Sequence, residues 1–230
     1  MAHDPTVGIL MLKTGFPRPP GDIGNPATWD FPVLYEVVEP AVVGRIVTDE
    51  SLPAGLIEVF IAAGRRLAEQ GVAALTTSCG FLAPLQPRLS AALPLPVATS
   101  SLMQIPWLQA ALGTAGRVGV ITIDAGKLTP AHFTGVGAPA DTPFVGVEEG
   151  RELHRVIFDD LAELDLAAAE ADVLAAGDAL RARLPDLAAV VLECTNMAPY
   201  SRALRTHLGV PVYDIVTLVD WLRAGLPEGR

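Results

Sequence analysis

The sequence predicts an α/β protein built from two similar lobes of parallel sheet flanked by helices. Three observations carry this prediction. Short apolar runs alternate with segments of helical periodicity along the chain, a pattern typical of parallel sheets covered by helices on both faces. Residues 74–84 and 189–199, 115 positions apart, match each other without a gap. Half of the 230 residues are apolar, which is enough for two lobes with sizeable cores.

The repeated unit has the same order of parts in both copies. Each copy reads as a buried strand, a turn with a cysteine, a short helix opened by proline, and a second strand. The alignment continues downstream, where Leu89 matches Leu204. Cys79 and Cys194 are the two cysteines of the chain and occupy equivalent positions. The sequence therefore predicts a pseudo-twofold duplication that keeps one thiol per copy.

In the first half, apolar runs predict strands at 7–12, 45–48, 72–77 and 97–99. Helical spacing of apolar residues predicts a helix at 53–70, where Pro53 suits the first turn and Gly71 the terminus. Further helices are expected at 84–93 and about 102–112. The segment from Gly15 to Pro32 has no periodicity and is rich in proline and glycine. A loop of this length indicates a binding loop or lid, or alternatively a rigid cover over the core.

In the second half, strands are expected at 117–123, 144–147, 188–192 and 212–213. Two helices are expected between 149 and 184, with a break near Leu164-Asp165, and further helices at 199–208 and 215–224. Gly209 is well placed to end the helix at 199–208. These elements divide the chain into a first lobe at 1–98 and a second lobe at 99–213. The C-terminal helix, 214–230, is a candidate part of the first lobe.

Composition excludes several classes of partner. The formal net charge of -10 argues against a nucleic-acid partner, which needs a concentrated basic face. No apolar run reaches the roughly 18 residues of a membrane helix. The first residues lack the pattern of a secretory signal, so a cytoplasmic protein is expected. Four scattered histidines predict no metal site, and the absence of a CxxC motif argues against thioredoxin-like redox chemistry.

Both cysteines are predicted to lie where a parallel sheet presents its ligand site. Cys79 and Cys194 each follow a strand and precede a helix, outside the carboxyl end of the sheet. A helix amino terminus lowers the pKa of a nearby thiol and attracts an anion. The alternative for each cysteine is a small residue of the core. Glu193 could raise the pKa of Cys194 by its charge, or point away.

Polar residues near the thiols and at the strand ends are candidates to bind the substrate. Several of them, including Thr77 and Ser78, could instead cap helices or satisfy turn backbone. The candidate substrate-binding residues are Lys13, Thr14, Asn25, Thr77, Ser78, Gly80, Thr122, Thr195 and Asn196.

The two cysteine turns, 77–80 and 193–196, resemble those of the aspartate/glutamate/hydantoin racemase superfamily. This resemblance covers most of the chain and implies an active site in the cleft between the lobes. It further implies a small carboxylate or carbonyl substrate, no cofactor, and often a homodimer. In the racemases of the superfamily two cysteines act as base and acid on opposite faces of the substrate. By resemblance, Cys79 and Cys194 take those roles.

The chain departs from glutamate racemases at three places. Those enzymes typically have Asn-Thr after the first cysteine, Thr-His after the second, and Asp-Ser after the first strand. This chain has Gly80-Phe81, Thr195-Asn196 and Lys13-Thr14 at these places. The differences argue against glutamate as the substrate, and Phe81 indicates a less polar pocket near Cys79.

The sequence therefore predicts an isomerase, namely a cofactor-independent racemase or epimerase that transfers a proton between two opposed cysteines. One alternative is a cofactor-free decarboxylase or cis–trans isomerase of a small dicarboxylate from the same superfamily. Another is a small-molecule binding protein without turnover. Pyridoxal phosphate chemistry needs a Schiff-base lysine, and neither Lys13 nor Lys127 stands beside a glycine-rich phosphate loop.

Overall fold

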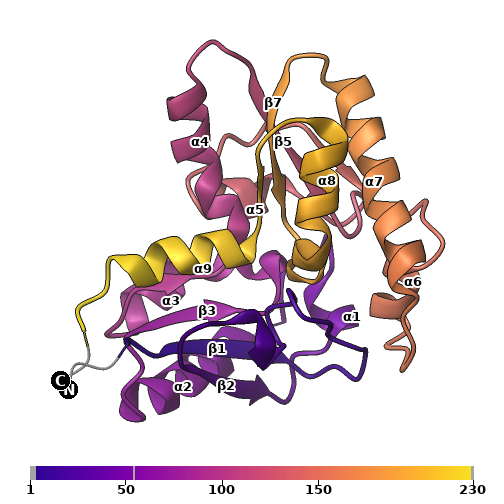
Figure 1. The fold of residues 1–230 in the computed structure, drawn as a ribbon. Coiled ribbons are helices and arrows are strands. Elements are labelled where there is room, and N and C mark those ends of the chain that lie inside the picture. Colours follow the sequence, from indigo (N-terminus) through magenta and orange to yellow (C-terminus); the bar gives the residue numbers. More distant parts are fainter. Residues whose placement is uncertain (1–3, 54, 229–230) are drawn as a thin grey trace.

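A computed structural model of the protein describes residues 4–53 and 55–228. It contains two four-stranded sheets, one in each half of the chain, and every strand pair is parallel. Figure 1 shows the first sheet in the lower lobe and the second sheet in the upper lobe, with helices around both. The α/β fold with two similar lobes that the sequence predicts is confirmed.

The two sheets have the same strand order. In the first sheet the order is β2 (Val33–Val38), β1 (Val7–Leu12), β3 (Ala74–Thr77), β4 (Val97–Ala98). In the second sheet it is β6 (Phe144–Gly146), β5 (Arg117–Thr122), β7 (Leu187–Leu192), β8 (Val212–Tyr213). Strands β1, β2, β3 and β4 thus correspond to β5, β6, β7 and β8, as a duplication requires.

The helices of the first half are α1 (Val43–Ile46), α2 (Leu56–Glu69), α3 (Gln86–Ala92) and α4 (Ile105–Leu112). Those of the second half are α5 (Pro130–Thr134), α6 (Leu153–Phe158), α7 (Leu166–Arg183), α8 (Ser201–Leu208) and α9 (Ile215–Ala224). Four short 3-10 helices complete the described chain: η1 (Pro26–Thr28), η2 (Gly80–Leu85), η3 (Ser101–Gln104) and η4 (Thr195–Tyr200).

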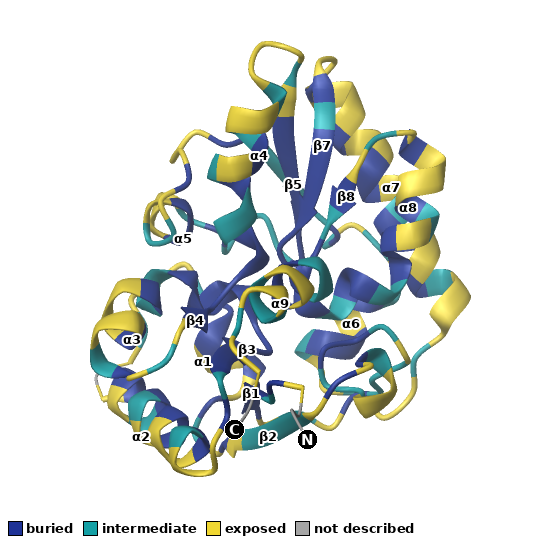
Figure 2. Ribbon diagram, turned by 60° about the vertical axis from the view of Figure 1, so that its left-hand side comes forward, coloured by how far each residue is buried: buried dark blue, intermediate teal, exposed yellow. Residues whose placement is uncertain are grey.

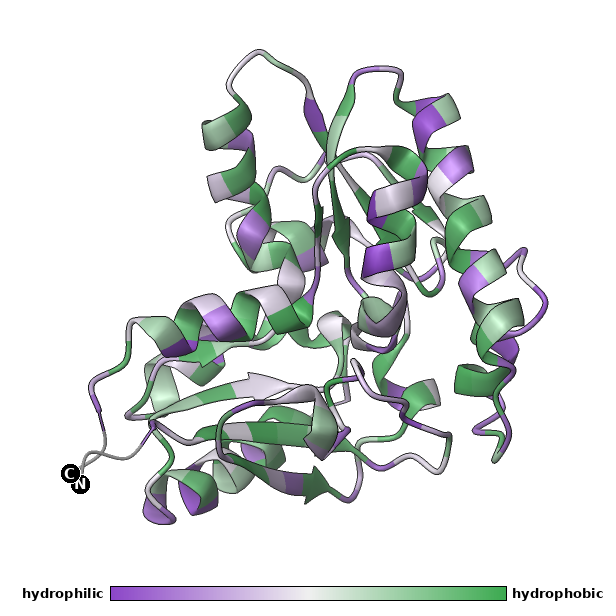
Figure 3. Cartoon of the chain, viewed as in Figure 1, coloured by the Kyte–Doolittle hydropathy of each residue, from purple (hydrophilic) through white to green (hydrophobic). Residues whose placement is uncertain are grey.

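Strand β1 is buried on both faces, and its side chains alternate between two hydrophobic clusters. Leu10 and Leu12 belong to the cluster that contains Phe60 of α2. Ile9 and Met11 belong to the cluster that also contains residues of α9. Because successive side chains of a strand point to opposite faces, β1 needs a helix on each side, and α2 and α9 supply them. Figure 3 shows β1 mostly in the green of hydrophobic residues.

The second sheet is covered in the same way. Helix α4 packs against β5 and β7, and α7 packs against β5 and β6. Figure 2 shows β5 and β7 as buried strands between α4 on one side and α7 with α8 on the other. The last helix of each half packs against the sheet of the other half. Helix α4 follows β4 in the chain and covers the second sheet, whereas α9 follows β8 and contacts β3 of the first sheet.

The structure corrects three predicted elements. Residues 45–48 do not form a strand: Val43–Ile46 is the short helix α1, and the edge strand is β2 at Val33–Val38. The sequence did not indicate β2 because an edge strand is only partly buried and Glu36 interrupts its apolar run. The structure also contains α5, which the sequence did not indicate because a helix of five residues is too short to show helical periodicity. The helices predicted from Pro84 and Pro199 begin earlier, as η2 and η4.

None of the helices within the described ranges is long and apolar enough to cross a membrane.

Candidate active site

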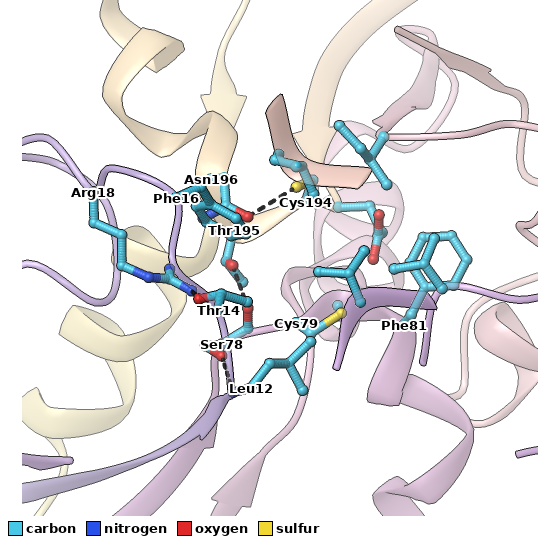
Figure 4. A pocket seen from close by; sticks show the side chains of 16 residues that line it. Leu12, Thr14, Phe16, Arg18, Ser78, Cys79, Phe81, Cys194, Thr195 and Asn196 are labelled. Carbon is cyan, nitrogen blue, oxygen red and sulfur yellow. Dashed lines mark hydrogen bonds between the residues drawn. The ribbon is translucent and has the colours of Figure 1, made fainter. Parts of the chain in front are cut away.

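The carboxyl ends of the central strands of both sheets meet at one enclosed cavity. Its volume is about 20 Å³, roughly the space of a single water molecule. Both cysteines line it, and Figure 4 shows their side chains approaching it from different elements. The other lining residues are Leu12, Thr14, Phe16, Arg18, Val43, Val47, Ser78, Gly80, Phe81, Ile123, Ile157, Glu193, Thr195 and Asn196.

The two thiols have matching backbone environments. Cys79 precedes η2 and Cys194 precedes η4, and the backbone N–H of the second residue after each cysteine, Phe81 or Asn196, lowers the pKa of the thiol. Both cysteines are free, and their exposed fractions are 9% and 7%. The duplication thus places the same thiol-bearing turn on both sides of the cavity.

Burial reverses the predicted effect of these turns on the thiols. Desolvation raises the pKa of both Cys79 and Cys194, and the charge of Glu193 raises both further. The backbone N–H groups and, for Cys79, the guanidinium of Arg18 lower the pKa to a smaller extent. Because desolvation disfavours the charged form, burial favours the protonated form of both thiols in this closed state.

Glu193 is a fully buried acid between the two lobes. Its Oε2 accepts a hydrogen bond of 2.7 Å from the hydroxyl of Thr122 at the end of β5. Its Oε1 has no hydrogen-bond partner in the described part of the chain. Burial raises the pKa of Glu193 from its ordinary 4.5 to about 7. Of the two possibilities that the sequence left open, the structure therefore shows the first: Glu193 raises the pKa of Cys194.

Glycine is required at position 80 by the close approach of Glu193. A Cβ atom at Gly80 would collide with Oε1 and with the backbone oxygen of Glu193. The first cysteine turn can therefore pack against the second only with glycine here. Gly80 takes part in the site through this contact between the lobes.

Hydrogen bonds join the two cysteine turns directly. The hydroxyl of Thr195 donates to the backbone oxygen of Ser78 at 2.7 Å. The hydroxyl of Ser78 accepts from the backbone N–H of Leu12 at 2.9 Å. These two contacts, drawn in Figure 4, connect the second turn to the first and the first to β1.

The loop after β1 closes over the cavity and brings Arg18 to it. Among the described residues that line the cavity, Arg18 is the one with a cationic side chain. Its Nη1 donates to Asp22 Oδ1 at 2.8 Å and its Nη2 to Thr14 Oγ1 at 3.0 Å. The guanidinium also lies over the ring of Phe16, 4.7 Å from the centroid. Arg18 is mostly buried, with 13% of its side chain exposed.

Two carboxylates tie this loop to the second lobe. Asp22 Oδ2 accepts from the side-chain nitrogen of Asn196 at 2.6 Å. Asp160 Oδ1 accepts from the backbone N–H groups of Gly15 and Phe16, at 2.6 and 3.1 Å. Asp160 itself has a φ of 51°, a left-handed conformation that is uncommon outside glycine.

Four candidate residues lie outside the lining of the cavity. Lys13 is exposed and pairs with Glu39 at 2.6 Å. Asn25 caps η1 and donates to the backbone oxygen of Arg18. The hydroxyl of Thr77 donates to the backbone oxygens of Cys79 and Thr99, and Thr122 holds Glu193. Thr14, Ser78, Gly80, Thr195 and Asn196 do line the cavity with both cysteines.

Several lining residues were not singled out by the sequence. Arg18 and Phe16 lie in the loop, where no periodicity shows which side chains turn inward. Val43, Val47, Ile123 and Ile157 read as ordinary core residues. An arginine within a predicted lid of an acidic protein is the one signal that could have indicated Arg18. The described residues contain no group of three or more His, Cys, Asp or Glu side chains placed to hold a metal ion.

Two named proteins are similar to nearly all of this chain. A dimethylsulfoniopropionate lyase of Durusdinium sp. clade D is 29% identical over 230 residues, which cover 97% of this chain and 75% of that protein. Dimethylsulfoniopropionate lyase 5 of Emiliania huxleyi (strain CCMP1516) is 32% identical over 229 residues, which cover 96% of this chain and 45% of that protein. The chain thus spans three quarters of the first relative and less than half of the second.

Solved structures and a family model agree on the superfamily. The Gly74Cys mutant of arylmalonate decarboxylase has a TM-score of 0.61 at 20% identity, covering 98% of this chain and 97% of that one. Allantoin racemase from Klebsiella pneumoniae has a TM-score of 0.62 at 19% identity, covering 98% and 90%. The model of the Asp/Glu/hydantoin racemase family matches residues 102–221. The fold, the duplication and this match together establish that the chain belongs to the Asp/Glu/hydantoin racemase family.

Proposed function

We propose that this chain is an enzyme that removes a proton from the carbon beside a carboxylate. Cys79 and Cys194 serve as its acid–base pair, without a cofactor. The observation that carries the proposal is that one thiol from each lobe lines the same enclosed cavity. One group can take a proton from the substrate carbon while the other supplies one from another side.

Arg18 is the group that we assign to the substrate carboxylate. It lines the cavity, is mostly buried, and uses two of the guanidinium's five N–H groups on Asp22 and Thr14. A carboxylate bound there would share its developing negative charge with a fixed cation in a site without bulk water, where such stabilisation is strongest. Because the cavity now holds little more than one water molecule, the loop or the lobes must open to admit a substrate.

Elimination is the overall reaction that the relatives support. Proteins named dimethylsulfoniopropionate lyase are 29% and 32% identical over 97% and 96% of this chain. Elimination from dimethylsulfoniopropionate starts with the step proposed above, the loss of a proton from the carbon beside the carboxylate. A carbon–carbon double bond then forms, and the carbon–sulfur bond breaks with its electron pair leaving on neutral dimethyl sulfide. The first candidate activity is therefore a lyase acting on a small carboxylate with a cationic leaving group.

Racemisation or epimerisation, the activity predicted from the sequence, is the second candidate. The matched backbone environment of the two thiols supports it, because a racemase must run the same proton transfer in both directions. An amino acid or a related carbonyl compound would then be the substrate, and the enzyme would be an isomerase.

The reaction products distinguish the two candidates. The protein is incubated with dimethylsulfoniopropionate and, separately, with single enantiomers of amino acids, hydantoins and α-substituted dicarboxylates. Gas chromatography detects dimethyl sulfide, NMR detects acrylate, and chiral chromatography follows optical purity. Equal release of dimethyl sulfide and acrylate is the expected result. Loss of optical purity without elimination would assign the racemase instead, and neither product from any substrate would contradict the proposed function.

A further inference from the structure

The two cysteine turns share a backbone arrangement but differ in one side chain. Asn196 follows Cys194 by two residues, and Phe81 stands at the equivalent place after Cys79. The Cys194 thiol donates a hydrogen bond to Asn196 Oδ1, with 3.6 Å between sulfur and oxygen. Phe81 offers no such acceptor, and its ring lies edge-on to His132, 4.8 Å between centroids. The duplication is therefore unsymmetrical at the thiols themselves.

Asp22 fixes which end of the Asn196 amide faces the thiol. The side chain of Asp22 is 1% exposed, and each of its contacts is with a donor. Oδ1 accepts from Arg18 Nη1 at 2.8 Å and from the backbone N–H of Gly24 at 2.7 Å, and Oδ2 accepts from Asn196 Nδ2 at 2.6 Å. Since a carboxylate can only accept, the nitrogen of Asn196 must point to Asp22. Its oxygen is then left for Cys194.

We propose that this chain of contacts keeps Cys194 protonated as the proton donor and leaves Cys79 as the thiol that gives up its proton first and then serves as the base. This inference rests on the proposed function for its chemical meaning. A thiol can donate to Asn196 Oδ1, but a thiolate would face that oxygen lone pair to lone pair, so the contact favours the protonated form of Cys194. Asp22 and Asn196 are positioning residues, because they act through the thiol. The contacts run from Arg18 through Asp22 and Asn196 to Cys194, as Figure 4 shows for its last link.

The charged groups around the thiols also favour a protonated Cys194 over a protonated Cys79. Glu193 raises the pKa of both cysteines, while Asp22 and Cys79 add to the effect at Cys194. Arg18 lowers the pKa of Cys79. An enzyme in which one thiol is held as the acid removes its proton from one side of the substrate. Such an asymmetry suits a one-directional elimination better than a reversible racemisation, because elimination moves a single proton, from the substrate carbon to Cys79, while the Cys194 thiol donates a hydrogen bond to the carboxylate oxygen on which negative charge develops.

Infrared spectroscopy of the S–H stretch tests the assignment without substrate. The Cys79→Ser variant leaves only the Cys194 band, and Cys194→Ser leaves only the Cys79 band. At neutral pH the Cys194 band is expected at lower frequency, because its S–H donates to the amide oxygen. Leucine has a similar shape to asparagine but no acceptor. Asn196→Leu should therefore raise the frequency of the Cys194 band to that of the Cys79 band. The double variant Asp22→Asn/Asn196→Asp restores a donor–acceptor pair with the roles exchanged and should keep the band low.

Alkylation order provides the second readout. Iodoacetamide should label Cys79 before Cys194 in the wild-type protein, as followed by peptide mass spectrometry. Asn196→Leu should speed labelling of Cys194 by about tenfold, and the double variant should not. The assignment is overturned if the two S–H bands coincide, if Asn196→Leu leaves the Cys194 band in place, or if Cys194 is labelled first. These readings need no turnover, so they can fail while the proposed activity holds, or hold while that activity fails.

Discussion

At the scale of single residues, Glu193 is the most unusual group of the site. It is a fully buried acid, one of its oxygens has no hydrogen-bond partner among the described residues, and its charge raises the pKa of both thiols. Burial of an unpaired carboxylate is unfavourable, so a structural role alone does not explain it. Because its pKa is raised to about 7, Glu193 changes charge near neutral pH, and the pKa values of both thiols change with that charge.

Replacing Glu193 by glutamine should change how stability depends on pH. The folded protein holds a proton on Glu193 up to about pH 7, whereas the unfolded chain releases it near 4.5. The protonated Glu193 contributes its whole share to the free energy of unfolding below pH 4.5, and this contribution is lost as the pH rises through 7. Glu193→Gln removes that dependence and keeps an acceptor for Thr122. Urea unfolding should therefore show the variant gaining on the wild type between pH 5 and pH 8, by up to about 3 kcal/mol. A difference that is the same at both pH values would contradict this.

At the scale of elements, the loop between β1 and β2 decides the shape of the site. It carries Phe16 and Arg18 to the cavity, and the carboxylates of Asp22 and Asp160 fix it in place. The sequence predicts a binding loop or lid, or a rigid cover over the core. Phe16 and Arg18 of this loop line the cavity, and the choice between these roles stays a prediction. Which of its side chains point inward depends on tertiary contacts with Asp160 and Asn196, more than 140 residues away.

Loss of the Asp160 contact should loosen the loop without unfolding the protein. Asp160→Ala removes the acceptor of two backbone N–H groups, those of Gly15 and Phe16. We expect hydrogen–deuterium exchange in peptides spanning 15–25 to become roughly tenfold faster. Peptides from α2 should be unchanged and serve as the internal control. Equal exchange of the loop in both proteins would show that Asp160 does not hold it.

The sequence predicted regular elements better than contacts. Strand β1 and helix α2 follow from apolar patterns that survive in the fold. The duplication located both cysteines at the cavity, because matched strand ends of a parallel sheet serve the same purpose. The sequence could not show that burial raises the pKa of the thiols more than the helix amino termini lower it. Nor could it show that Asn25 caps η1 while Asp22, three residues earlier, accepts a hydrogen bond from Asn196. Such outcomes depend on distances between segments far apart in the chain.

At the scale of the whole molecule, the exchange of α4 and α9 ties the two lobes together. Ile215, Leu218 and Val219 of α9 pack with Val7 and Ile9 of β1. Together with Trp29 and Phe31 of the loop after β1, α9 covers this face of the first sheet. The core of the first lobe thus includes a helix that starts only at residue 215.

A pair of substitutions in α9 tests this packing. Leu218 is buried at 4% exposure, while Trp221, three positions on, is 73% exposed. Leu218→Ala should lower the free energy of unfolding by about 2–5 kcal/mol, and Trp221→Ala should change it by less than about 0.5 kcal/mol. Chemical denaturation of both variants beside the wild type gives the comparison. Similar losses from both would place α9 differently from the structure.

The homodimer expected from the resemblance to the racemases stays a prediction. The most exposed large hydrophobic side chains of the described chain include Trp107 of α4 and Trp221 of α9. Light scattering at several protein concentrations would determine the oligomeric state.

The most direct measurement of the central claim is exchange of the substrate proton with solvent. The protein and its substrate are incubated in deuterium oxide, and NMR follows the signal of the carbon beside the carboxylate as product forms. Deuterium should enter at that carbon, or elimination should proceed, in the wild type and in Trp221→Ala. In Cys79→Ser and in Cys194→Ser both should fall by at least about 100-fold, because each thiol has its own part in the proton transfer. Exchange near the wild-type rate in either cysteine variant would show that the two thiols are not the acid–base pair.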